Sequence, residues 1–370
     1  MSRNELLYQV ALSRVRGMGV DLAQKLLEVV GSEKEFFDLS AKDLMQLTGG
    51  KSKILERDYR NACLAKAERE MEFVEKNNIT ISYFTDESYP QRLLNACDAP
   101  ILLFSLGDCD LNAQHIVSIV GTRKSTEYGR RLTDDLLRDL AEAVPGLVTV
   151  SGLAYGSDIN AHRSSIKHGL PTVAVLACGL NKIYPDAHRA DAATIVSNGG
   201  CIVSDYTSQD LLHRGNFVAR NRIIAGLSDC TIVVESADKG GSLITANIAQ
   251  SYNRDLFAVP GRVGDEYSKG CNRLIRSNQA MLITCAGDLI DAMRWEHAKP
   301  QKTVAELELF PQLSPEEQAI VEVIKQAGDI HVNALASKTG LPIYKVMSHL
   351  VELDCRGVIL TLPGCRYAMS

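Results

Sequence analysis

One short segment of the chain brings basic, amide and aromatic side chains close together. Residues 214–222, RGNFVARNR, contain three arginines, two asparagines and one phenylalanine, whereas the whole chain has a net charge of −5 and only 6% aromatic residues. Guanidinium groups bind backbone phosphates, and an aromatic ring stacks on a base at about 1–3 kcal/mol. The alternative is that Phe217 belongs to the core and that the arginines are solvated or paired with Asp205 and Asp210. That alternative must explain why RNR opens a helix, where cations oppose the helix dipole and a bound polyanion would offset the cost.

Glycine, hydroxyl and basic residues also follow other apolar runs of the chain. GTRKSTEYG follows the run 116–120, SGLAYGSD begins at the end of the run 147–151, and SADKGGSLITA follows the run 230–235. Glycine lets a ligand approach the backbone, and the first turn of a helix offers free amide groups to an anion. If the first and fourth runs border one crevice, the cations that follow them converge on it: Arg123, Lys124, Arg214, Arg220 and Arg222.

The same segments lack the patterns of common enzyme classes. Neither G-x-G-x-x-G nor G-x-x-x-x-G-K-[ST] occurs, which argues against a nicotinamide cofactor and a Walker nucleotide triphosphatase. His162 follows Asp158 by four residues, a spacing that suits a metal pair, but a capping or packing role is favoured. Glu235 ends a strand close to GGSLITA, so a nucleotide-processing hydrolase is kept as the alternative function. We predict no enzyme activity, and no catalytic residue, metal or cofactor.

Apolar runs alternate with helical periods between residues 116 and 260. The runs are IVSIV, LVTVS, TVAVL, CIVSD, CTIVVE and LFAVP, and a stretch with helical spacing separates most neighbouring runs. Continuous apolar strands that alternate with amphipathic helices indicate a parallel sheet covered on both faces. We therefore predict an α/β fold with a doubly wound, extended Rossmann-like sheet in residues 79–295, of which 79–114 form a pre-sheet segment. Ligands of such sheets bind beyond the carboxyl ends of the strands.

Two smaller regions flank the predicted sheet. Residues 1–78 read as a helical domain, in which RGMGVDLAQKLLEVVG weakly resembles half of a helix-hairpin-helix. Residues 296–313 read as a linker, and 314–370 as a winged helix. Its first helix has Ser314 as N-cap and Pro315 at its first position, its helix-turn-helix turns at Gly340, and its hairpin turns at Pro363–Gly364. Because 312–370 holds five basic and six acidic residues, we expect a protein contact or weak DNA binding from it. A third hypothesis is a regulatory winged-helix protein whose α/β domain senses a ligand.

Composition limits the setting in which the chain works. Of its 370 residues, 45% are hydrophobic, yet no apolar run approaches the roughly 20 residues of a membrane helix, and no secretory signal is visible. We therefore expect a cytoplasmic protein with no membrane partner. Ten cysteines occur without a C-x-x-C pair, which favours reduced and buried thiols, several of them in apolar runs: Cys178, Cys201, Cys230 and Cys285.

With these motifs in order, the chain resembles the DprA/Smf family of DNA-processing proteins. The resemblance rests on VGTR (120–123), SGLAYGSD (151–158) with AH, RNRIIAGLSD (220–229), GGSLITA (240–246), AVPG and GCNRLI. It implies a protein that binds single-stranded DNA, protects incoming DNA during natural transformation and helps to load the RecA recombinase. It also implies a homodimer formed through the α/β domain, and it implies no enzyme.

The resemblance also assigns roles to individual residues. The family's pocket uses an Arg, a Lys and a Phe, which match Arg123, Arg214 and Phe217. Here Arg stands in place of the Lys, Val218 in place of a Pro, and GSD in place of GID, differences that we expect to tune the pocket. The predicted nucleic-acid-binding residues are Gly121, Thr122, Arg123, Ser151, Gly152, Arg214, Asn216, Phe217, Arg220, Asn221, Gly241 and Ser242.

Overall fold

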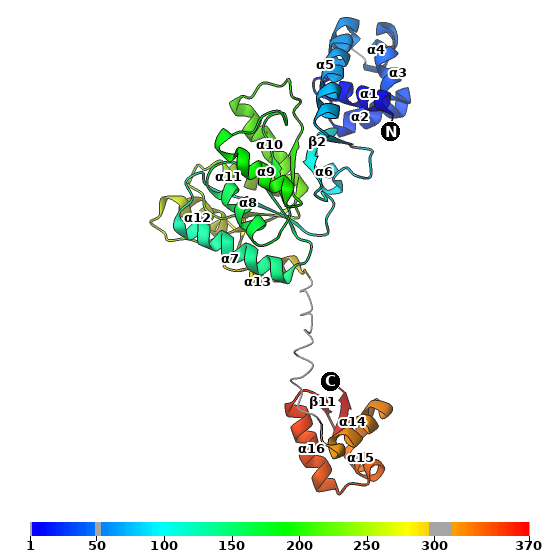
Figure 1. Ribbon diagram of the computed structural model, residues 1–370, viewed down its shortest axis with the longest axis vertical. Coiled ribbons are helices and arrows are strands. Elements are labelled where there is room, and N and C mark those ends of the chain that lie inside the picture. The colour runs from blue at the N-terminus through cyan, green and yellow to red at the C-terminus, as the bar shows by residue number, and fades with distance from the viewer. Residues whose placement is uncertain (1, 49–52, 296–312, 370) are drawn as a thin grey trace. The chain divides into compact units, whose positions relative to one another are not determined.

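The computed structural model describes residues 2–48, 53–295 and 313–369, and its contacts divide the chain into two units, Met1–Ala298 and Lys299–Ser370 (Figure 1). The predicted linker, 296–313, lies outside the described residues except for Leu313. No helix in the described part is long and apolar enough to cross a membrane.

The first unit begins with short helices, as the spacing of apolar residues and glycines indicated. A capping box of Ser2 and Glu5 starts the first helix, and Gly31, with a φ of 92°, ends the second. The helices are α1 (Arg3–Ser13), α2 (Val20–Val30), α3 (Glu33–Asp38), α4 (Ala41–Thr48), the 3₁₀ turn η1 (Lys53–Leu55) and α5 (Arg57–Lys76).

Polar contacts join these helices to the α/β part of the same unit. Arg14 pairs with Asp210 at 2.6 Å. The Glu70 carboxylate accepts hydrogen bonds from the backbone amide and the hydroxyl of Ser208, at 2.9 and 2.6 Å. The helices therefore contact the segment of chain that leads into RGNFVARNR, and Asp210 is engaged by Arg14 and not by that segment.

A nine-stranded sheet forms the centre of the first unit. Its order is β1-β2-β6-β5-β4-β3-β7-β8-β9. The strands in the part β6-β5-β4-β3-β7-β8-β9 are parallel, whereas β2 pairs antiparallel with β6, and β1 pairs antiparallel with β2. The predicted doubly wound α/β fold is confirmed. The strands are β1 (Thr80–Tyr83), β2 (Leu102–Gly107), β3 (Ile116–Val120), β4 (Val148–Ser151), β5 (Thr172–Val175), β6 (Cys201–Ser204), β7 (Cys230–Val233), β8 (Asp255–Ala258) and β9 (Met281–Leu282).

Helices cover both faces of this sheet because alternate strand residues are apolar on both sides. Val117 and Ile119 of β3 contribute to the core under one set of helices, whereas Ile116 and Val120 face the other set. The first set is α7 (Glu127–Ala143), α8 (Ser157–Lys167), α9 (Arg189–Ser197) and α13 (Ala286–Met293). The second set is α6 (Gln91–Leu94), α10 (Arg214–Leu227), α11 (Ser242–Ser251) and α12 (Lys269–Arg276).

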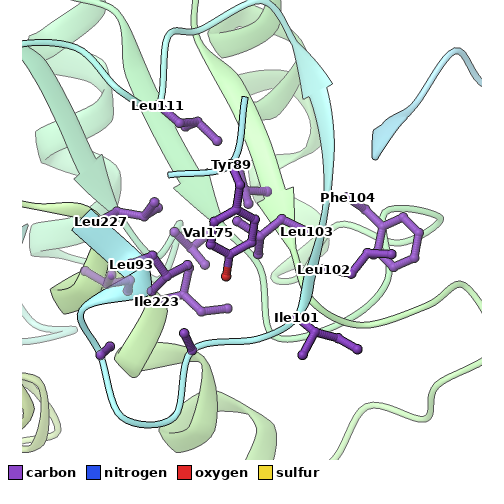
Figure 2. Packing of buried hydrophobic residues seen from close by; sticks show 14 of the residues in the cluster. Tyr89, Leu93, Ile101, Leu102, Leu103, Phe104, Leu111, Val175, Ile223 and Leu227 are labelled. Atoms are coloured by element: carbon purple, nitrogen blue, oxygen red, sulfur yellow. The ribbon is translucent and has the colours of Figure 1, made fainter. Parts of the chain in front are cut away.

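The pre-sheet segment packs against α10 and holds it on the sheet. Figure 2 shows Tyr89 and Leu93 of this segment beside Ile223 and Leu227 of α10, all of them buried. A Cβ atom at Gly226 would lie 2.4 Å from a methyl carbon of Leu93, so the buried Leu93 side chain would have to shift to admit a larger residue. The helix that carries the basic segment is thus fixed from both sides.

The described cysteines are all free thiols. Cys178, Cys201 and Cys230 are buried, as expected from their apolar runs. The same expectation was wrong for Cys285, which is exposed because it is the N-cap of α13 and not part of a strand.

The second unit has the element order of a winged helix. Ser314 caps the first helix and Pro315 begins it, as predicted, and Glu317 completes a capping box with Ser314. The predicted turns are confirmed at Gly340, which caps α15, and at Gly364 in the hairpin, both with positive φ. The elements are α14 (Pro315–Ala327), β10 (Asp329–His331), α15 (Val332–Thr339), α16 (Ile343–Cys355), β11 (Ile359–Leu362) and β12 (Arg366–Met369).

Candidate nucleic-acid interface

A pocket of about 360 Å³ lies at the point where the order of the parallel strands reverses. From β3 the chain proceeds first to β4 on one side and later to β7 on the other, and open α/β sheets bind ligands at such a switch point. The pocket is lined by the end of β3, by α10, and by the loop after β7 with the start of α11. The predicted binding residues that line this pocket are Gly121, Thr122, Arg123, Phe217, Arg220, Asn221, Gly241 and Ser242.

The convergence of the two basic segments has a different cause from the one expected. The strands before Arg123 and Arg214 are β3 and β6, and β4 and β5 separate them in the sheet, so they do not border one crevice. Instead, α10 starts after β6 and crosses the sheet to reach β7, which places it against β5, β4 and β3. Because Phe217 belongs to α10, the path of this helix over the sheet places its ring beside Arg123.

A second expectation about α10 was wrong. The helix begins at Arg214 and not at RNR, so Arg220 and Arg222 lie well inside it. Their charges therefore do not oppose the helix dipole at an N-terminus, and the argument that a bound polyanion must offset such a cost no longer applies.

Arg123, Phe217 and Tyr184 form a layered cluster at the rim of the pocket. The guanidinium carbon of Arg123 lies 5.9 Å from the centre of the Phe217 ring. On another side, the Tyr184 ring packs edge-on against Phe217, with centres 5.3 Å apart and planes at 62°. Arg123 and its neighbour Lys124 are exposed, and no carboxylate within the described residues forms an ion pair with either. Two cations and an aromatic cluster are thus available to a ligand.

Arg220 has an internal role in place of the predicted contact with phosphate. It is 4% exposed, and its Nη1 donates hydrogen bonds to the carbonyl oxygens of Gly152, at 2.8 Å, and Val175. Burial raises the pKa of the nearby Asp158 carboxyl, an effect that the charge of Arg220 partly offsets. The side chain thus joins α10 to the ends of β4 and β5, and builds the pocket floor.

Several other predicted binding residues are engaged inside the protein. Asn216 donates to the carbonyl of Ala177 at 3.1 Å, and Ser151 donates to the carbonyl of Ile119 at 2.6 Å. Neither they nor Gly152 line the pocket. Ser242 does line it, but its hydroxyl donates to Ser236 at 2.9 Å. These residues therefore shape the site through hydrogen bonds inside the protein.

The remaining arginines of the segment divide between the two hypotheses. Arg222 forms an ion pair with Asp205 and donates to the carbonyl of Asp98, so the pairing alternative holds for this residue. Arg214 is exposed at the first position of α10, outside the pocket lining. It remains available as a cation at the approach to the pocket.

The acidic residues that motivated an enzyme have structural partners. Glu235 is 4% exposed and accepts hydrogen bonds from the amide and hydroxyl of Thr126, at 2.9 and 2.5 Å, and from the hydroxyl of Ser125 at 3.1 Å. It therefore braces the start of α7, which has Thr126 as its N-cap. His162 is buried, its Nδ1 lies 2.8 Å from the hydroxyl of Thr172, and burial lowers its pKa to about 3. The His162 imidazole is therefore neutral and has the packing role that the sequence favoured.

Replacing Glu235 by glutamine is expected to lower the free energy of unfolding by about 1–3 kcal/mol, because an amide cannot accept all three hydrogen bonds. Urea denaturation measures this change. The control is Glu127→Gln, which alters an exposed carboxylate of α7, the helix whose start Glu235 braces. Unchanged stability of Glu235→Gln, or turnover of nucleoside monophosphates that this substitution abolishes, would contradict the bracing role and favour the hydrolase.

The sequence comparisons agree with this architecture. Residues 80–294 match the family described as DNA recombination-mediator protein A, and residues 302–365 match the DprA winged helix domain. The chain belongs to the DprA family. It is therefore a member of a family of DNA-processing proteins, as the resemblance of its motifs implied.

Two curated relatives show how far the DprA likeness extends. Protein Smf of Escherichia coli is 33% identical over 288 residues, which cover 75% of this chain and 74% of the relative. DNA processing protein DprA of Streptococcus pneumoniae is 38% identical over 205 residues, covering 55% of this chain and 71% of the relative.

Two solved DprA structures have the same fold. The X-ray structure of DprA from Streptococcus pneumoniae aligns with a TM-score of 0.64 and 30% identity, covering 78% of this chain and 98% of that one. DNA processing protein A from Helicobacter pylori, whose structure was described for its single-stranded DNA binding mode, aligns with a TM-score of 0.53 and 32% identity. That alignment covers 59% of this chain and 98% of the other.

Sequence reasoning missed the tyrosine of this site. Tyr184 lies in the segment ACGLNKIYP after β5, and it is not among the predicted binding residues. An aromatic residue directly before a proline, in a loop at the carboxyl end of a parallel strand, was the signal that could have identified it.

Proposed function

We propose that this protein binds single-stranded DNA in the pocket at the switch point of its sheet. The observation that carries the proposal is the exposed Arg123 lying over Phe217 at the rim of a glycine-lined pocket. Cations for the backbone beside rings for the bases are the general means by which proteins hold single strands. The Helicobacter pylori relative, which was described for its single-stranded DNA binding mode, supports the same function here.

Backbone groups complete the proposed phosphate site. Gly240 and Gly241 line the pocket and precede α11. The amides of Leu243 and Ile244 already donate to the carbonyl oxygens of Gly240 and Gly241, but the positive end of the helix dipole still favours an anion at this position. A phosphate bound by Arg123 beside this helix start, next to a base on the aromatic cluster, fits the residues that line the pocket.

The finer functions implied by the family stay proposals for this chain. They are protection of incoming DNA in natural transformation, loading of RecA, a cytoplasmic location and a homodimer formed by the α/β domain. For the homodimer, β9 offers a surface: it is an edge strand of the sheet, and Met281 and Leu282 on it are about half exposed. The apolar face of α16, with Tyr344, Met347 and Val351 exposed, supports a protein contact for the winged helix.

Binding of labelled single- and double-stranded oligonucleotides across a salt series tests the proposed function. The single strand is expected to bind more tightly, because its bases are free to stack and its backbone fits a narrow pocket. A plot of the logarithm of its affinity against the logarithm of the salt concentration is expected to fall with a slope of about −0.7 for each phosphate contact. Equal affinity for the duplex, or no binding at low salt, would contradict the proposal.

A further inference from the structure

Two exposed tyrosines stand on the rim next to the pocket. Tyr155 follows β4 and Tyr184 follows β5, and these strands are neighbours in the sheet. Each side chain is 49% exposed, and only two other aromatic residues in the described part are exposed, Tyr128 and Tyr344. We propose that Tyr184, with Tyr155 beside it, forms a base-stacking surface for single-stranded DNA. The inference rests on the proposed function.

Both rings are held in place before any ligand binds. Tyr184 packs edge-on against Phe217, and Tyr155 packs edge-on against His188, with ring centres 4.8 Å apart and planes at 68°. The Nδ1 atom of the buried His188 lies 2.8 Å from the carbonyl oxygen of Leu153. This contact joins the loop after β5 to the loop after β4. A ring that is already fixed loses little conformational entropy when a base stacks on it.

Phe217 is a less accessible platform than Tyr184. Its side chain is half-buried, Arg123 lies over its ring and Tyr184 packs against it. An edge-on contact leaves at least one face of each ring free, and the more exposed of the two rings is Tyr184. Phe217 therefore supports the tyrosine and orients Arg123, while the tyrosine face meets the base.

The charges around this surface suit the backbone of the same strand. Lys182, two residues before Tyr184, is exposed, whereas Arg189 and Arg163 are paired with Asp186 and Asp191. Arg123, across Phe217 from Tyr184, and Lys182 thus supply two cations that form no ion pair with any described residue. A single strand has free bases for this surface, whereas a duplex has its bases stacked and paired.

The inference is tested by measuring how tightly Tyr184→Leu and Tyr155→Leu bind two oligonucleotides of equal length. One oligonucleotide has its bases and the other is abasic. Against the normal strand, we expect Tyr184→Leu to bind about 5- to 150-fold more weakly, with an unchanged salt slope, because a stacking contact is lost but no charge. A smaller loss is expected for Tyr155→Leu. Against the abasic strand, both variants should bind as the unsubstituted protein does. Tyr184→Phe, which keeps the ring, should restore most of the affinity.

Tyr128→Leu is the matched control, because Tyr128 is also 49% exposed but lies on α7, where its hydroxyl donates to Pro260. Unchanged affinity of Tyr184→Leu for the normal strand would overturn the stacking role. So would an equal loss for both strands, which would make Tyr184 only a support of Phe217. In either case, a loss of binding in Arg123→Ala would show that the proposed function itself stands.

Discussion

Arg123→Ala is expected to bind single-stranded oligonucleotides about 10- to 100-fold more weakly than the unsubstituted protein. A charge-assisted contact with phosphate contributes about 1.5–3 kcal/mol, and this guanidinium has no ion-pair partner among the described residues that would compensate for its loss. The slope of log affinity against log salt should also decrease by about 0.7, because one phosphate contact disappears. Fluorescence anisotropy over a salt series measures both quantities.

Arg131→Ala is the control for this prediction. Arg131 is an exposed arginine on α7 that pairs with Glu127, so its removal changes the net charge equally without touching the pocket. Equal losses for the two variants would mean that long-range charge, and not a specific contact, drives binding. Full affinity of Arg123→Ala would show that the DNA binds elsewhere.

Arg220→Met is expected to lower the free energy of unfolding by about 3 kcal/mol or more. Methionine fills most of the volume but leaves the carbonyl oxygens of Gly152 and Val175 without their donor, and the buried Asp158 without its nearest compensating charge. Urea denaturation, followed by circular dichroism, measures the change. Arg214→Met, an exposed position on the same helix, should change stability by less than about 0.5 kcal/mol.

The Arg220 prediction also separates a structural role from a binding role. A variant that has lost stability binds DNA poorly at any temperature at which part of it is unfolded. Affinities should therefore be compared where Arg220→Met is fully folded, and there we expect a loss smaller than that of Arg123→Ala. A variant as stable as the unsubstituted protein but unable to bind would instead identify Arg220 as a phosphate ligand.

The fold followed from the sequence because its pattern is local. The six predicted strands are short apolar runs, and the helices between them show a helical period in the sequence. β9, which has only two residues and is exposed, has no such run and was not predicted. The winged helix could be predicted in the same way, from Ser314, Pro315 and the turns at Gly340 and Gly364.

The order of the strands was harder to predict, because it depends on how long crossovers pack, and β3 and β6 were wrongly expected to border one crevice. The direction of individual side chains in α10 was predictable but was not worked out. Asn216, Arg220, Ile223 and Leu227 recur at helical spacing and are all buried. Phe217 and Asn221 fall on the adjoining face, which lines the pocket. Placing Arg220 in the apolar stripe would have shown that it points into the protein.

The contacts of the N-terminal helices with residues 208 and 210 have a consequence for how the molecule responds to DNA. Arg14 and Glu70 hold the chain immediately before α10, the helix that forms one wall of the pocket. Opening of the helical region therefore releases the entrance to α10, and a ligand that fixes α10 makes such opening rarer. We therefore expect the first 78 residues and the pocket to open together, so that a ligand in the pocket also slows proteolysis of the helical region.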